Sequence, residues 1–78
     1  MDDALHSQIQ DLIERGDLSG VDCAATWFGS GRGERCGACQ RRILGSEVAV
    51  ECDVPGGGMV VFHAQCYEIW HSLVTPRA

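Results

Sequence analysis

Long apolar runs and an excess of positive charge are both missing from this 78-residue chain. No stretch approaches the roughly 20 apolar residues that a membrane-spanning helix needs. The N-terminus, Met1-Asp2-Asp3-Ala4, is acidic where a secretory leader is basic, and no long apolar run follows it. We therefore expect a cytoplasmic protein without membrane contact. In that reducing setting, clustered cysteines indicate a metal more often than a disulfide.

Lysine is absent from the sequence, and the six basic residues are all arginine against 11 acids, which gives a net charge of −5. That sign disfavours a general nucleic-acid-binding protein, which normally presents a basic face. The charges are unevenly spread, because residues 1–22 contain six acids and one arginine. The opposite holds for residues 32–42, where Glu34 is the one acid beside four arginines: Arg32, Arg35, Arg41 and Arg42. Nucleic acid is thus an unlikely partner, but these arginines keep phosphate binding open.

Large apolar side chains are also scarce, since aromatic residues make up 6% of the chain. A domain of this size seldom buries enough apolar surface to be comfortably stable, and it usually adds a metal or disulfides. We expect one compact domain without internal repeats. Residues 1–34 are predicted to form an N-terminal helix and a Gly-rich loop, and residues 35–78 a zinc-binding module.

The candidate for the stabilising group is Cys36-Gly-Ala-Cys39 followed, after 23 residues, by His63-Ala-Gln-Cys66. Each pair has a two-residue spacer, so one local turn can aim both donors at one ion. Three thiolates and one imidazole are a ligand set that tetrahedral Zn²⁺ prefers in closed structural sites. The spacing predicts one structural zinc ion, bound by Cys36, Cys39, His63 and Cys66.

Two other residues could enter this ligand set: Cys52 in place of His63, and His71 alongside Cys66. We interpret Cys52 as a small apolar core residue, because it is in phase with the valines of a predicted strand. His71 lies more than a helical turn beyond Cys66 and is expected on the helix surface. The remaining candidates, Cys23 and His6, are interpreted as ordinary residues.

The apolar residues of the N-terminal segment recur at helical spacing from Asp2 or Asp3 to Arg15, and Gly16 can end that helix. The stripe consists of Leu5, Ile9, Leu12 and Ile13. Residues 17–22 are rich in turn formers. Residues 23–28 form a short apolar segment that we expect to pack on the core, with no secondary structure assigned to it. Residues 29–33 are predicted to be a flexible glycine loop.

The second half of the chain carries strand and helix patterns. Residues 47–54 alternate, with Val48, Val50, Cys52 and Val54 expected on one face. Pro55–Gly58 is predicted to reverse the chain into a return strand over residues 59–62. After this strand, the apolar residues recur at helical spacing as far as Leu73, and the predicted helix is expected to end at Pro76. The predicted fold class is α+β: an N-terminal helix, a zinc knuckle, a β-hairpin and a C-terminal helix.

That order resembles the treble-clef family of zinc domains, over about Arg35–Val74. The C-x2-C…H-x2-C series is similar to the first zinc site of LIM domains. Tyr67-Glu-Ile-Trp70 stands where a LIM domain continues with a second cysteine set, so the resemblance implies a single zinc. The chain also resembles small uncharacterised bacterial zinc-binding proteins with a Gly-rich loop, a C-x2-C and a terminal F-H-x2-C-aromatic-x2-W segment. This last likeness implies no activity.

An enzymatic role is not expected. Four good ligands leave no open metal position for water, and no βαβ pattern precedes the C-x2-C to suggest a redox motif. The residues after Gly29–Gly33 lack the Lys-Ser/Thr of a phosphate-binding loop. We expect a non-enzymatic zinc-binding module that acts in protein–protein interaction or regulation. The alternatives are a nucleic-acid accessory factor and a zinc- or redox-responsive regulator.

Overall fold

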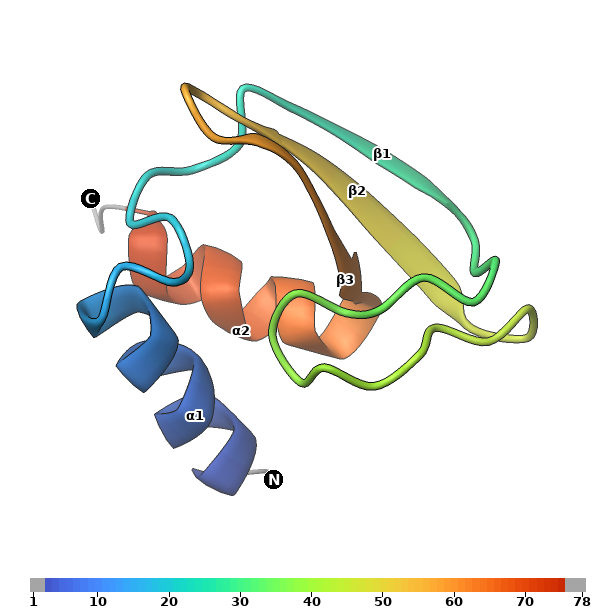
Figure 1. Cartoon of the computed structure of the whole chain (residues 1–78), viewed down its shortest axis with the longest axis horizontal. Coiled ribbons are helices and arrows are strands. Elements are labelled where there is room, and N and C mark those ends of the chain that lie inside the picture. Colours follow the sequence, from blue (N-terminus) through green and yellow to red (C-terminus); the bar gives the residue numbers. More distant parts are fainter. Residues whose placement is uncertain (1–2, 76–78) are drawn as a thin grey trace.

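The computed structural model describes residues 3–75 as two helices and three strands. In chain order they are α1 (Asp3–Glu14), β1 (Ala25–Ser30), β2 (Val48–Val54), β3 (Gly58–His63) and α2 (Ala64–Val74). Helix α2 lies between the sheet and α1, so the molecule has three layers (Figure 1). The expected α+β class is confirmed. The predicted helix limits at Asp2 and Pro76 lie outside the described residues.

Helix α1 forms where its apolar spacing predicts it. Ile9 is fully buried, and the other three residues of the stripe pack partly buried against the core. The helix ends as expected, because Gly16 adopts a positive φ of 82° that glycine accepts without a side-chain clash. The N–H of Asp17 then donates to the carbonyl of Leu12 at 2.9 Å. This end turns the chain back toward α2.

The sheet has three antiparallel strands in the order β1-β2-β3, where the sequence predicted only the β2–β3 hairpin. Strand β1 takes in Gly29 and Ser30, which the sequence placed in a loop. Its aromatic residues favour a strand. However, Trp27 on one face is 52% exposed and Phe28 on the other is 67% exposed. The strand therefore has no buried-to-exposed alternation that a sequence pattern could reveal.

The predicted flexibility of residues 29–33 is wrong at Gly31. This residue is buried, and its N–H donates to the carbonyl of Glu47 at 2.9 Å. A Cβ atom at Gly31 would collide with the carbonyl oxygen of Leu44 and lie 2.7 Å from Cγ2 of Ile43. Glycine is required here because two backbone segments meet.

The core lies between the sheet and α2. Val50, Cys52, Val54 and Phe62 are buried, and Phe62 stacks on Trp70 with ring centroids 5.1 Å apart. Val48 departs from the predicted pattern, because it starts the strand beyond the cover of α2 and is 48% exposed. The loop after α1 is tied to this core through the indole N–H of Trp70, which donates to a loop carbonyl.

Cys23 and Cys52 form a disulfide, with Cα atoms 5.5 Å apart. Cys52 is a fully buried core residue, as predicted, and Cys23 lies outside the metal cluster. The bond between them was not predicted, so Cys23 is more than an ordinary residue. The register places Thr26 opposite Cys52, so Cys23 reaches Cys52 because the chain turns in toward β2 just before β1, where Ala24 N–H donates to the carbonyl of Asp53 at 2.8 Å. The bond fastens the start of the edge strand to the centre of the sheet.

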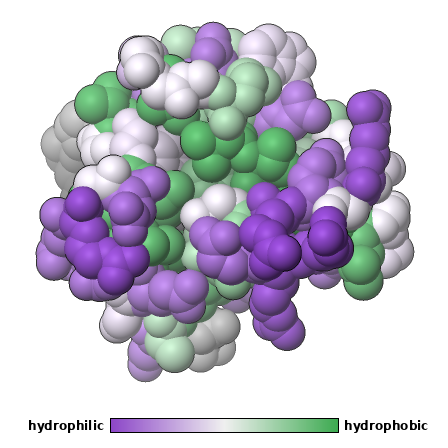
Figure 2. All heavy atoms as spheres, in the orientation of Figure 1, coloured by the Kyte–Doolittle hydropathy of each residue, from purple (hydrophilic) through white to green (hydrophobic). Residues whose placement is uncertain are grey.

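Polar and apolar residues are separated on the surface. On the face seen in Figure 2, hydrophilic residues gather over α1 and over the loop before β2, with an apolar area between them. Neither helix of the described part of the chain is long and apolar enough to cross a membrane.

Candidate metal centre

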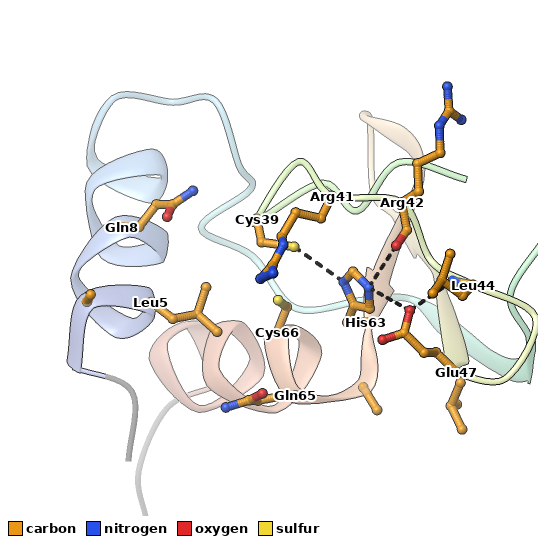
Figure 3. Close-up of a pocket in the computed structure, with 13 residues that line it drawn as sticks. Leu5, Gln8, Cys39, Arg41, Arg42, Leu44, Glu47, His63, Gln65 and Cys66 are labelled. Atoms are coloured by element: carbon orange, nitrogen blue, oxygen red, sulfur yellow. Dashed lines mark hydrogen bonds and ion pairs between the residues drawn. The ribbon is translucent and has the colours of Figure 1, made fainter. Parts of the chain in front are cut away.

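The structure brings the four predicted ligands together. Cys36 and Cys39 come from the loop between β1 and β2, His63 ends β3, and Cys66 lies in the first turn of α2. Their four ligand atoms all lie within 4.8 Å of one another. Figure 3 shows Cys39, Cys66 and His63 facing a common point. The cluster could therefore hold a metal ion.

The two cysteines of the loop sit on a tight turn. Cys36 N–H donates to the carbonyl of Arg41 at 2.9 Å, and Gln40 N–H donates to the carbonyl of Cys36 at 3.0 Å. Gln40 follows the second cysteine and has a φ of 67°, a left-handed conformation that costs a non-glycine residue energy. Its side-chain amide bonds the carbonyl of Gly37 at 3.3 Å. The turn thus aims both sulfurs to one side.

Gly37 docks this turn against the outer edge of β3. Its N–H donates to the carbonyl of Val61 at 2.8 Å. A Cβ atom at Gly37 would lie 2.7 Å from Cγ1 of Val60, closer than packed side chains allow. The strand that receives the turn ends at His63, so this contact joins the two ligand pairs.

Cys36 is the most strongly stabilised thiolate of the cluster. A hydrogen bond from the Cys66 thiol lowers the pKa of Cys36 to about 4, helped by the N–H groups of Cys39, His63 and Ala38 and opposed by burial. The N–H groups of Ala38 and His63 each lie 3.4 Å from its sulfur. Backbone donors of this kind orient and stabilise metal-bound thiolates.

The other two thiols hold their protons more tightly. The hydrogen bond to Cys36 raises the pKa of Cys66, and burial raises the pKa of Cys39. Several thiolates this close together repel one another, so full deprotonation of the cluster requires a cation. A divalent metal ion would supply that charge, and its binding would release the protons.

His63 presents one ring nitrogen to the sulfurs and the other to oxygens. Its Nδ1 lies 3.3 Å from Cys39 Sγ, whereas its Nε2 lies 3.2 Å from the carbonyl of Arg42 and 3.3 Å from the carboxylate of Glu47. Burial by itself lowers the pKa of His63. The Cys36 thiolate and the Glu47 carboxylate raise that pKa by more than burial lowers it, so the pKa of His63 is raised overall. Because Nδ1 faces the sulfurs and Nε2 faces two oxygens, Nδ1 is the nitrogen that can bind a metal.

Sequence analysis did not identify Glu47 as a contact of His63 and only included it in the strand predicted over residues 47–54, whereas β2 begins at Val48. The sequence did contain information on the position of Glu47. A chain reversal at Pro55–Gly58 predicts that Ala49 pairs with His63, and the structure shows this pair. Glu47, two residues earlier, then lies beyond the end of the pair and beside the imidazole. Glu47 also accepts a hydrogen bond from Leu44 N–H at 2.8 Å, which lowers its pKa, and His63 lowers that pKa further.

The competing ligands lie elsewhere. Cys52 is bonded to Cys23. His71 pairs with the carboxylate of Asp22 at 3.2 Å and stacks on Tyr67. His6 is exposed on α1.

The donor set fits Zn²⁺. Ligand atoms at the bond lengths of tetrahedral zinc lie about 3.5–3.8 Å from one another, and the four atoms here, all within 4.8 Å of one another, would have to move by about 1 Å at most to reach that spacing. Calcium and magnesium prefer oxygen ligands, and sulfur predominates in this cluster. A groove of about 860 Å³ opens beside the cluster between α1 and the loop, lined in part by Leu5, Arg41 and Leu44.

Comparison of the chain with protein-family models, with curated proteins and with solved structures gave no match.

If the cluster binds a metal ion, Glu47→Gln is expected to weaken that binding about tenfold, because a carboxylate that accepts from a metal-bound imidazole contributes about 10–100-fold to affinity and the Arg42 carbonyl remains. The fold should be unchanged, since glutamine can still accept from Leu44 N–H. Competition with a chromophoric chelator measures the affinity. Glu51→Gln, on the sheet face away from α2, is the matched control. Equal affinities for the two variants would contradict a role for Glu47.

Proposed function

We propose that this chain is a non-enzymatic module with one structural Zn²⁺, held by Cys36, Cys39, His63 and Cys66. The observation that carries the proposal is the convergence of the four ligand atoms from two separate segments. Bound there, zinc would cross-link the loop before β2 to the junction of β3 and α2. In a domain this small, such a link contributes directly to the folding free energy.

A treble-clef-like arrangement with LIM-like ligand spacing is part of this proposal. The turn at Cys36–Cys39, the hairpin β2–β3 and a helix with the last ligand in its first turn follow one another in the order of that family. Helix α1 and strand β1 are additions that precede this unit. The residues after Cys66 pack as core, which supports one zinc ion per chain.

The site favours a structural over a catalytic metal. Three cysteines and one histidine complete a tetrahedral zinc site without an open position. Cys36, although it has the lowest thiol pKa, is fully buried and cannot meet a substrate. We therefore propose no enzymatic activity.

We propose that the module acts by contact with protein. Its surface carries two signs, since Asp3, Asp11 and Glu14 are exposed on α1 and the arginines gather on the loop before β2. Arg35 and Arg42 donate to the loop carbonyls of Gln40 and Gly33, at 2.8 and 2.7 Å. The loop is thus ordered while its charge stays exposed. Separated patches of opposite sign favour partners with complementary patches.

The nucleic-acid alternative is tested by titrating labelled duplex DNA with zinc-loaded protein at physiological salt. Segment 32–42 carries +3, so the rest of the chain carries −8 of the net −5. Because these acids repel phosphate, we expect binding weaker than the about 10⁻⁴–10⁻⁶ M of ordinary non-specific binding. Micromolar affinity that falls with salt and is lost in the Arg41→Ala/Arg42→Ala variant would instead support a nucleic-acid accessory factor.

The Cys23–Cys52 disulfide favours the second alternative function, that of a redox-responsive regulator. We propose a cytoplasmic location, where glutathione keeps such a pair as thiols. The Cys23–Cys52 bond would then form only under oxidation.

A further inference from the structure

The two edges of the sheet are protected unequally. On the outer edge of β3, the Val61 carbonyl accepts from Gly37 N–H, and His63 N–H points at the Cys36 sulfur. Beyond β1, the sheet has no further strand in the described part of the chain. Strand β1 is therefore the open edge.

The register fixes which groups point out from that edge. Gly31 N–H donates to the Glu47 carbonyl, which continues the pairing of Ser30 with Val48. In an antiparallel ladder, every second residue bonds to the neighbouring strand. Residues 25, 27 and 29 thus face β2, and Thr26, Phe28 and Ser30 present their N–H and C=O groups outward. Within residues 3–75, no hydrogen bond reaches these outward groups.

The side chains of β1 are also suited to association. Residues 23–31 contain no charge and no proline, two of the features that normally block an exposed edge. Trp27, on the sheet face away from α2, and Phe28, on the face toward α2, are both more than half exposed. Beside Trp27, the small residues Gly29 and Ala49 help to line a hollow of about 360 Å³.

We propose that two copies of this chain pair antiparallel through β1, about a twofold axis at Phe28, to form a continuous six-stranded sheet. Thr26 then lies opposite Ser30 of the second copy, and Phe28 opposite Phe28. All three residues have both main-chain groups free, so this register forms six hydrogen bonds across the axis. An isologous arrangement of this kind closes at two copies.

The same register places the aromatic residues where they fit. Trp27 lies beside Gly29 of the second copy and covers the hollow next to it, and the contact is made twice. An aromatic ring over a glycine on the neighbouring strand shields the exposed backbone. On the other face, the two Phe28 rings form a cross-strand aromatic pair. The dimer would bury both exposed rings of each copy.

Charge does not oppose a second copy in this orientation. Residues 23–31 are uncharged, and in the register about Phe28 the side chain of Arg32 falls opposite Ala24 of the second copy. The acidic helix α1 lies on the far side of α2 from the sheet, away from the proposed interface (Figure 1). The net negative charge of the two copies is therefore held apart.

The test is sedimentation equilibrium of the full chain, loaded with zinc, over a range of concentrations. Phe28→Lys is expected to raise the dimer dissociation constant at least about tenfold, because like charges meet directly opposite each other. Thr26→Pro should act in the same direction, since it removes an outward N–H and leaves the ladder to β2 intact. Gln10→Lys, exposed on α1 and away from the sheet, is the control and should dimerise as the unchanged protein does.

A protein that stays monomeric across that range, or a dimer that both edge variants leave unchanged, would overturn the proposal. A monomer that instead binds an extended peptide along β1 would also overturn it, in favour of strand addition by another protein. Zinc content and thermal unfolding of each variant are measured on the same samples. Failure to dimerise is thereby distinguished from failure to bind zinc or to fold.

Discussion

Cys36→Ala is expected to unfold the hairpin and α2 under conditions where the unchanged protein is folded. Cys36 is buried and accepts hydrogen bonds from two backbone N–H groups, so the substitution would remove a proposed metal ligand and leave those donors unpaired. A structural zinc supplies about 10–16 kcal/mol of apparent binding energy, as large as the roughly 5–15 kcal/mol net stability of a whole domain. Chelation of the metal should have the same effect.

Amide dispersion in an NMR spectrum measures this outcome. The dispersed resonances of β2, β3 and α2 should collapse when a chelator is added and return with excess zinc. His71→Ala is the control, because His71 lies outside the cluster on the same helix. A spectrum that keeps its dispersion after complete metal removal would contradict a zinc-dependent fold.

Cys23→Ser is expected to lower the free energy of unfolding by about 3–4 kcal/mol under oxidising conditions, the entropic contribution of a cross-link that closes a loop of this length. The two cysteines are 29 residues apart. Denaturant unfolding with and without a phosphine reductant, which contributes no thiolate to compete for zinc, measures the effect. Cys23 is the better position to change, because truncation of the fully buried Cys52 would also open a cavity.

The reductant provides the control in this experiment. It should bring the unchanged protein down to the stability of the variant and leave the variant itself unaffected. Zinc affinity should be equal in the two proteins, because neither Cys23 nor Cys52 belongs to the cluster. An unchanged protein with the same stability in both conditions would show that the bond contributes nothing.

Features that depend on local pattern could be predicted from the sequence. Helix α1 follows from the spacing of its apolar residues, and the hairpin follows from alternation around Pro55–Gly58. The four clustered side chains follow from two short spacers, each of which acts within a single turn. Each of these signals is contained in a few neighbouring residues.

Features that depend on tertiary neighbours could not be predicted. Strand β1 is exposed on both faces, so no alternation marks it. Gly31 looks flexible in sequence and is fixed by backbone segments that approach it from the loop before β2. The disulfide joins residues far apart in sequence, and a metal interpretation of the cysteines obscured it. The position of Glu47 beside His63 could be predicted only by extending the hairpin register two residues beyond its last pair, Ala49 with His63.

Native mass spectrometry of the purified protein tests the central claim most directly, because it counts metal ions on each chain. We predict one zinc per chain in the unchanged protein and in the Cys23→Ser and His71→Ala variants, and none in a Cys36→Ala/His63→Ala variant. A metal-free protein, two ions per chain, or zinc that survives the loss of Cys36 and His63 would contradict the assignment.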